Sequence, residues 1–253
     1  MTRLSTIACA IGFAYFVPLL SIAQNVTERS VEVRTSLGFR VPAPAVQNLL
    51  PAGWTVPPGV DSSNSGKANI TVTLMERLMV VDAKEQPVSS GTSRYAVITT
   101  AARNAEGKSA TFALGGISPE APGSYDIYLP AVTAKVERTT EGQGIEAGRA
   151  KETWEFATAK GEKISLTLQY RRGRLTKSHS DPVIRSGRHP EFQRTYHLDQ
   201  ASEVLRGSSS STDRVETISF KASGSYLSAL FDGSETLLTV TSVPWYYREI
   251  TVP

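Results

Sequence analysis

A dense group of charged and aromatic side chains between residues 145 and 170 has the composition of a reactive site. Lys151 and Lys160 flank Trp154 and Phe156, and Arg149 precedes all four. A lysine in an apolar cavity has a lowered pKa, so it can act as a nucleophile and form a Schiff base with a ketone or a β-keto acid. The same side chains could instead form a solvated face of a sheet, in which case they would do no chemistry.

The pattern of this stretch predicts two strands joined by a tight turn at Lys160–Lys163. Apolar side chains occupy every second position of the second half, at Ile164, Leu166, Leu168 and Tyr170. This period of two is typical of a half-buried strand. We therefore expect the second strand to be ordinary core and the first to carry any site, with Arg149 as the anion-binding residue and Trp154 as a wall.

Glu76 is the second candidate for chemistry. It lies in phase with the apolar side chains of a predicted strand over Asn69–Asp82. A carboxylate on an apolar face is costly unless it is paired or protonated, so such residues are often functional. Two structural alternatives remain open: a bulge near Met75 could turn Glu76 outward, or the carboxylate could pair with an arginine.

The N-terminus predicts a secretory signal peptide over residues 1–23. Arg3 gives the positive charge, residues 7–20 form an apolar run, and the small residues that follow favour cleavage before Gln24. The alternative is an uncleaved anchor helix, but the run is short for a bilayer span. We expect the mature protein to be periplasmic or secreted, without a stable membrane anchor.

Cysteine content supports this location. Cys9 is the single cysteine of the 253-residue chain, so the mature protein is expected to lack a disulfide, a thiol nucleophile and a cysteine-based zinc site. With 40% hydrophobic and 20% charged residues the composition is that of a globular protein, and the net charge of +3 does not by itself imply nucleic acid.

Short alternating segments along residues 24–253 predict one mainly antiparallel, barrel-like β domain with one or two short helices. Helical turns are expected at Pro42–Pro51 and Gln200–Leu205, and Tyr226–Phe231 could be a strand or a helical turn. The glycine-rich stretch Gly115–Gly123 predicts a loop. Separate strands are expected at Leu237–Val243 and Tyr246–Val252, besides five between residues 31 and 138 and one at Arg214–Lys221. A barrel would enclose a cavity lined by every second residue.

The segment Arg171–Arg194 is strongly basic and is expected to be a solvated loop. It contains or adjoins all three histidines, His179, His189 and His197. Their spacing matches no zinc motif, so no metal and no cofactor are expected. His197 and Asp199 could activate a serine such as Ser178, but the Gly-x-Ser-x-Gly signature of many hydrolases is missing. The segment lacks the interleaved aromatics of a nucleic-acid binder.

Three short motifs resemble the acetoacetate decarboxylase-like superfamily. They are Leu50-Pro51-Ala-Gly53, the Gly91 to Tyr95 segment, and Ala147-Gly148-Arg149 followed by an aromatic residue and a lysine. The resemblance covers most of the mature chain. It implies a cone-like barrel whose cavity binds a small keto or aromatic compound, and it adds Tyr95 to the candidate ligand-binding residues.

The departures from this family's pattern concern its chemistry. Ala150 stands where the family has a glutamate after the Gly-Arg pair, and no proline precedes the nearest lysine, Lys160. Tyr95 is followed by Ala96 and Val97 rather than by the expected glutamate. The resemblance therefore implies the fold rather than Schiff-base decarboxylation.

Two functions are consistent with the sequence. The first is an exported β-barrel that binds a small anionic or carbonyl-containing molecule, and that would be a lyase if it is an enzyme. Its candidate catalytic residues are Lys160 and Glu76, and its candidate ligand-binding residues are Arg149, Trp154, Phe156 and Tyr95. The alternative is a non-catalytic β-sandwich that mediates contacts at the cell envelope. A barrel requires Glu76, Arg149 and Trp154 to face a closed cavity.

Overall fold

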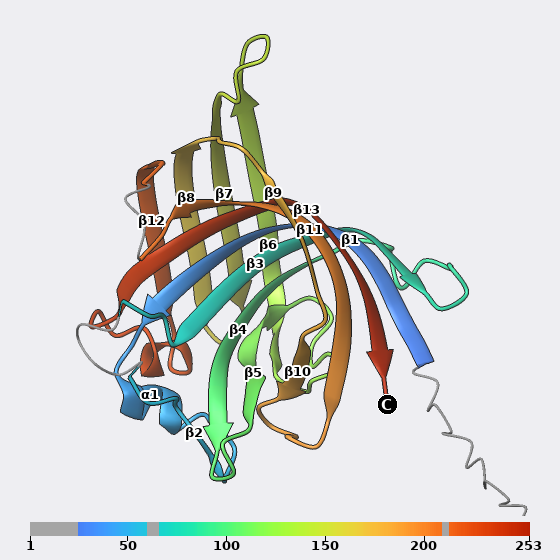
Figure 1. Cartoon of the computed structure of the whole chain (residues 1–253), viewed down its shortest axis with the longest axis vertical. Coiled ribbons are helices and arrows are strands. Elements are labelled where there is room, and N and C mark those ends of the chain that lie inside the picture. Colours follow the sequence, from blue (N-terminus) through green and yellow to red (C-terminus); the bar gives the residue numbers. More distant parts are fainter. Residues whose placement is uncertain (1–24, 60–65, 209–212) are drawn as a thin grey trace, which may run out of the picture.

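The computed structural model describes residues 25–59, 66–208 and 213–253, and strands make up most of it (Figure 1). The strands are β1 (Asn25–Arg40), β2 (Trp54–Thr55), β3 (Ile70–Asp82), β4 (Ser93–Asn104), β5 (Ser109–Ser118), β6 (Tyr128–Glu141), β7 (Arg149–Thr158), β8 (Lys163–Arg171), β9 (Thr176–Ser180), β10 (Val183–Ser186), β11 (Gln193–Arg206), β12 (Val215–Ser223) and β13 (Thr236–Val252). The helical elements are α1 (Ala43–Gln47) and the 3-10 turn η1 (Leu227–Ala229). The signal peptide predicted for residues 1–23, with Cys9, lies outside the described residues.

Seven strands close into a barrel in the order β5, β10, β11, β13, β1, β3 and β4, with β4 pairing back to β5. The pairs within this ring are antiparallel except for β5 with β10, which run parallel. The longest pairing joins β1 to β13, so the two ends of the described chain lie side by side (Figure 1). The predicted mainly β, barrel-like fold with almost no helix is confirmed.

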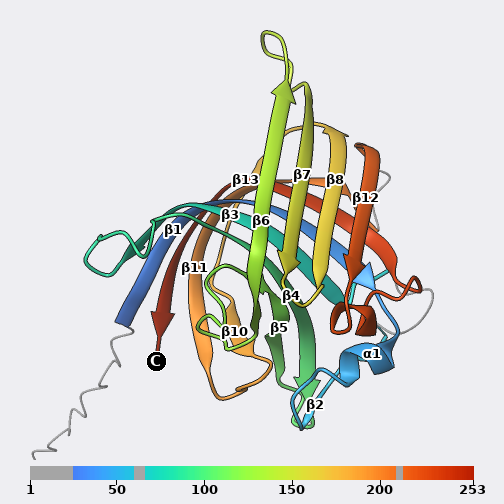
Figure 2. The same cartoon turned by 180° about the vertical axis from the view of Figure 1, so that it is seen from behind.

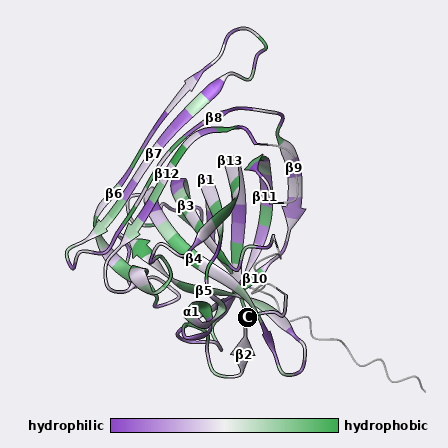
Figure 3. Ribbon diagram, turned by 90° about the vertical axis from the view of Figure 1, so that its left-hand side faces the viewer, coloured by the Kyte–Doolittle hydropathy of each residue, from purple (hydrophilic) through white to green (hydrophobic). Residues whose placement is uncertain are grey.

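Four strands form a second layer, which we call the wing: β6, β7, β8 and β12. The wing leaves the barrel where β6 pairs in parallel with the end of β5, at residues 116–118 and 128–130. Its strands are antiparallel to one another, and β7 and β8 are the predicted hairpin. Figures 2 and 3 show the wing lying against one side of the barrel, with the β6–β7 end projecting beyond it.

The two faces of each barrel strand belong to different environments. On β3, Val72 and Leu74 pack into the core that lies between wing and barrel, whereas Met75 packs into a second cluster inside the ring. Trp154 and Phe156 of the wing are fully buried in the first core. Strand alternation thus gives the barrel an apolar outer side under the wing and a more polar inner side.

A buried carboxylate links the wing to the barrel. Glu152 of β7 accepts hydrogen bonds from the hydroxyl groups of Thr35 on β1 and Tyr170 on β8, and from the indole nitrogen of Trp154. Tyr170 also hydrogen-bonds Ser242 of β13 at 3.1 Å. These bonds satisfy a charge that would otherwise be costly to bury.

The predicted loop at Gly115–Gly123 is wrong in its first half, because β5 continues to Ser118. The two glycines serve close packing instead. A Cβ atom at Gly115 would lie 2.0 Å from the Tyr226 hydroxyl, and one at Gly116 would lie 2.1 Å from the Ala96 carbonyl oxygen. Side chains at these positions would push β4 and Tyr226 away, so glycine is required inside the strand.

The predicted helix at Gln200–Leu205 is also wrong, since these residues lie within β11. Pairing with β13 on one side and β9 on the other overrides the local preference. The basic segment is only partly a loop, because it contains β9 and β10. The two separate strands predicted at Leu237–Val243 and Tyr246–Val252 form a single strand, β13. The helical turns at α1 and η1 agree with the predictions.

Candidate functional site

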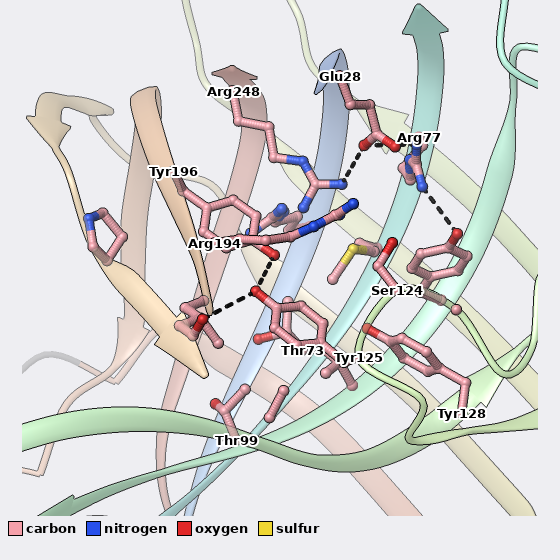
Figure 4. A pocket seen from close by; sticks show the side chains of 18 of the residues that line it. Glu28, Thr73, Arg77, Thr99, Ser124, Tyr125, Tyr128, Arg194, Tyr196 and Arg248 are labelled. Carbon is pink, nitrogen blue, oxygen red and sulfur yellow. Dashed lines mark hydrogen bonds and ion pairs between the residues drawn. The ribbon is translucent and has the colours of Figure 1, made fainter. Parts of the chain in front are cut away.

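A cavity of about 200 Å³ lies inside the barrel (Figure 4). Its lining comes from all seven strands of the ring and from the segment between β5 and β6. The apolar part of the lining includes Met75, Val97 and Ile184. The polar part is dominated by four arginines and five tyrosines, at positions 34, 77, 194 and 248 and at positions 95, 125, 128, 196 and 246.

Glu32 is the centre of the charges beside this cavity. Its side chain is fully buried on β1 and accepts from the Ser30 hydroxyl. Arg34 lies 2.6 Å from one of its oxygens and Arg248 of β13 lies 2.9 Å from the other. Burial opposes ionisation of Glu32, but the two guanidinium groups and the hydroxyl outweigh it and lower its pKa to about 2.

Two further glutamates, Glu28 and Glu120, form ion pairs with the third arginine, Arg77. Glu28 lies 2.9 Å from Arg77 and 3.1 Å from Arg248, and Glu120 lies 3.6 Å from Arg77. Arg77 is almost completely buried and also donates to the Tyr95 hydroxyl at 2.9 Å. We call this set the arginine–glutamate network: Glu28, Glu32, Glu120, Arg34, Arg77 and Arg248.

Arg194 stands apart from the network. It reaches into the cavity from β11, and its guanidinium carbon lies 5.9 Å from the centre of the Tyr125 ring (Figure 4). Its Nε atom is buried without a hydrogen-bond partner. Within the described part of the chain, no carboxylate forms an ion pair with it. Arg194 is therefore a cation in the cavity to which the described residues provide no counter-charge.

The tyrosine hydroxyl groups add neutral donors and acceptors to the lining. Those of Tyr125 and Tyr196 lie 2.6 Å apart, and Tyr95 donates to Glu120. Burial raises the pKa of Tyr95 to about 12 despite the opposing charge of Arg77. Burial likewise raises the pKa of Tyr125, next to Tyr196. Tyr95 and Tyr125 consequently stay protonated at neutral pH, and phenol hydroxyl groups of this kind can donate hydrogen bonds to oxygen atoms of a ligand.

No lysine lines this cavity among the described residues. The arrangement can bind an anion through a guanidinium group, hydrogen-bond a carbonyl oxygen through phenol groups, and pack a planar body against aromatic rings. The hydrogen bond between Tyr95 and Glu120 joins a phenol and a carboxyl group in the lining. The part of the lining that the structure describes contains no side-chain amine that could form a Schiff base.

Of the predicted site residues, only Tyr95 lines the barrel cavity. Lys160 lies in the exposed turn between β7 and β8, and Arg149 is exposed and paired with Glu216 at 2.9 Å. Trp154 and Phe156 lie in the core between wing and barrel. The barrel therefore does not bring the predicted group together, and the roles assigned to its members stay predictions.

Glu76 pairs with arginines, which was the second of the two structural alternatives considered for it. Arg94 lies 2.7 Å from one carboxylate oxygen and Arg138 lies 2.5 Å from the other. Arg138 also stacks over Trp154, with its guanidinium carbon 4.5 Å from the ring centre. Glu76 thus pairs with arginines on the side of β3 that faces the wing.

The pocket arginines were not identified from the sequence, and one of them, Arg77, lies on the face of β3 opposite to Glu76. Arg77 follows Thr73 and Met75 at every second position of β3, one residue out of phase with Glu76. Tyr246 and Arg248 repeat this spacing on β13. An arginine and a tyrosine two positions apart on one face of a strand, as at Tyr246 and Arg248 or at Arg194 and Tyr196, were the signal that could have located the cavity.

The histidines lie on the outside of the barrel. His197 contacts Asp181 at 2.7 Å and Thr251 at 3.3 Å, and His179 lies between two aspartates. In the ranges that the structure covers, no group of three or more such side chains is placed to hold a metal ion. The described helices are also too short and too polar to cross a membrane.

The closed barrel with its attached wing is the fold of acetoacetate decarboxylase-like proteins. One similar solved structure is the enduracididine biosynthesis enzyme MppR, complexed with the condensation product of pyruvate and imidazole 4-carboxaldehyde. It has a TM-score of 0.52 and 14% identity over 96% of this chain and 95% of that one. Another is an acetoacetate decarboxylase-like enzyme from Sphingomonas wittichii RW1, with a TM-score of 0.52 and 12% identity over 96% and 100% of the two chains.

The resemblance expected from the sequence motifs is thereby confirmed for the fold. No family model matches the sequence, and no curated protein matches it. At identities of 12% and 14%, the similarity concerns the arrangement of the strands. Function has to be argued from the side chains of this chain.

Proposed function

We propose that this protein binds a small carboxylate- or carbonyl-containing molecule inside the barrel without forming a Schiff base. The observation that carries the proposal is the cavity lining, in which guanidinium and phenol groups surround a space of about 200 Å³ and no described lysine takes part. One similar barrel, MppR, has been solved with a condensation product of pyruvate. That complex supports a small organic acid as the kind of molecule this fold accommodates.

Catalysis and location extend the proposal. A lyase activity of this chain would use the Tyr95–Glu120 pair for proton transfer, because these two groups share a hydrogen bond at the cavity wall.

Export to the periplasm or beyond rests on the sequence of residues 1–23. Mass spectrometry of the protein recovered from a bacterial periplasm tests export, and a chain that begins at Gln24 is the expected result.

Calorimetric titration with pyruvate, acetoacetate, phenylpyruvate and benzoate tests the binding site. The variant Val97→Phe adds volume to a side chain of the cavity lining, so it should abolish binding of whichever compound binds the wild type. Val132→Phe makes the same change at a position that is 68% exposed on the wing, and it should leave binding unchanged. Equal binding by Val97→Phe and the wild type would place the ligand elsewhere.

Borohydride trapping tests the absence of Schiff-base chemistry. Treatment with pyruvate or acetoacetate and borohydride should give no adduct by mass spectrometry, because no described lysine reaches the cavity. An adduct on Lys151 or Lys160 would contradict the proposal and restore the lysine mechanism.

A further inference from the structure

The charges around the cavity do not balance. Three glutamates and three arginines of the arginine–glutamate network neutralise one another through contacts of 2.6 to 3.6 Å. Arg194 is the fourth arginine, and its lack of an ion pair among the described residues leaves one positive charge in excess. A charge in a partly desolvated site is costly unless an opposite charge pairs with it, so the excess favours one bound anion.

The geometry of Arg194 fits a carboxylate. A guanidinium group presents its donors in a planar fork that matches the two oxygens of a carboxylate. Among the described residues the Nε atom of Arg194 has no hydrogen-bond partner although it is buried, and the guanidinium carbon lies 5.9 Å from the centre of the Tyr125 ring. Figure 4 shows the labelled Arg194 among the side chains that line the pocket. A donor without a partner in the described structure is therefore available to a ligand in the cavity.

The size and lining of the cavity limit the rest of the ligand. A cavity of about 150 Å³ is large enough to hold benzene, so the space of about 200 Å³ has room for one ring and a carboxylate. Tyrosine rings and Met75, Val97 and Ile184 supply the apolar part of the lining. Flat apolar bodies pack well against such aromatic faces.

We propose that Arg194 is the anchor for a single carboxylate and that the ligand is a monocarboxylate with a planar body of about one ring. This inference rests on the proposed function and names its ligand class. A second carboxylate on the ligand would have to compete with Glu28, Glu32 or Glu120 for an arginine that is already paired. Since Glu32 is fully buried between Arg34 and Arg248, the network resists that exchange.

Matched pairs of compounds test the charge count by calorimetry. Benzoate and its neutral amide, benzamide, differ in the charge, while butyrate and succinate differ in a second carboxylate. Benzoate should bind the wild type about tenfold or more tightly than benzamide, because a charge-assisted hydrogen bond contributes more than a neutral one. Butyrate should bind more tightly than succinate. Tighter binding of succinate, or equal binding of benzamide, would overturn the proposal.

Variants of Arg194 test the anchor itself. Arg194→Gln should weaken benzoate binding by about tenfold or more and leave benzamide binding unchanged. Arg194→Lys keeps the charge but loses the planar fork, so its affinity should fall between the two. Arg188→Gln removes an arginine from the same segment that is exposed and paired with Asp126, and it serves as the matched control.

The outcomes separate the two proposals. If the wild type binds none of the four compounds, and none of the keto acids, both proposals fail. If benzoate binds, Val97→Phe abolishes the binding and Arg194→Gln does not weaken it, then the barrel binds small acids and the anchor proposal alone is wrong. Thermal unfolding verifies that each variant is folded, and Arg194→Gln should not lower the melting temperature, because the described residues form no ion pair with this cation.

Discussion

Glu32 offers the sharpest test of the electrostatics inside the barrel. Replacing it by Gln keeps the shape of the side chain but removes the negative charge that Arg34 and Arg248 share. Removing one partner of a buried ion pair leaves uncompensated charge and costs about 3 to 5 kcal/mol. We expect Glu32→Gln to lower the free energy of unfolding in urea by about that amount at pH 7.

The pH dependence gives an independent magnitude. The folded protein holds the pKa of Glu32 at about 2, below the ordinary value of 4.5. A carboxylate with a lowered pKa contributes stability above its unfolded pKa and loses it as the pH falls through the folded pKa. The shift corresponds to about 3 kcal/mol. This contribution should be complete above about pH 5 and disappear progressively between pH 4.5 and 2.

The assay is urea unfolding followed by tryptophan fluorescence, at several pH values between 7 and 2. The difference between the wild type and Glu32→Gln should shrink as Glu32 is protonated, because the amide resembles the protonated carboxyl group. Glu155→Gln is the matched control, since Glu155 pairs with Lys163 at an exposed site where ion pairs contribute little. The reasoning is refuted if Glu32→Gln is no less stable than Glu155→Gln, or if the difference persists unchanged at low pH.

Two further predictions concern packing and the link between wing and barrel. Gly116→Ala should lower the free energy of unfolding by about 1 to 3 kcal/mol, because its new methyl group would overlap the Ala96 carbonyl oxygen. Gly142→Ala in the exposed β6–β7 connection is the control. Equal melting temperatures of the two variants in thermal unfolding would contradict the argument. Tyr170→Phe should cost about 1 to 3 kcal/mol in urea, because Glu152 loses a buried donor and Ser242 a partner. An unchanged free energy of unfolding would show that water replaces this hydroxyl group.

The sequence was sufficient for the elements that alternate strongly. The β7–β8 hairpin could be predicted because Ile164, Leu166, Leu168 and Tyr170 all face the same core. The sequence was insufficient where contacts between distant segments determine the secondary structure. Gly115 and Gly116 are signs of a loop when considered locally, and only the approach of Tyr226 and Ala96 explains why a strand needs them.

The site could not be located from the sequence for a related reason. Alternation shows that a strand has two faces but does not show which face an additional layer will cover. The wing covers the more apolar face of β3, so Glu76 points toward the wing while Arg77 points into the cavity. Arg248 and Glu28 are 220 positions apart, and no local spacing reveals that they will pair.

Ring closure at β10 has a consequence for how molecules exchange with the interior. β10 is joined to β5 and to β11 by three residue pairs each, whereas β1 and β13 share fourteen. Within the seven-strand ring β10 has the fewest residue pairs, and segments with little pairing open locally at free energies well below that of global unfolding. Amide hydrogens of Ile184 to Ser186 should therefore exchange with deuterium earlier than those of β1. Each such opening would expose the wall beside Arg194, and it would let the ligand that we propose enter and leave while the other strands of the ring stay paired.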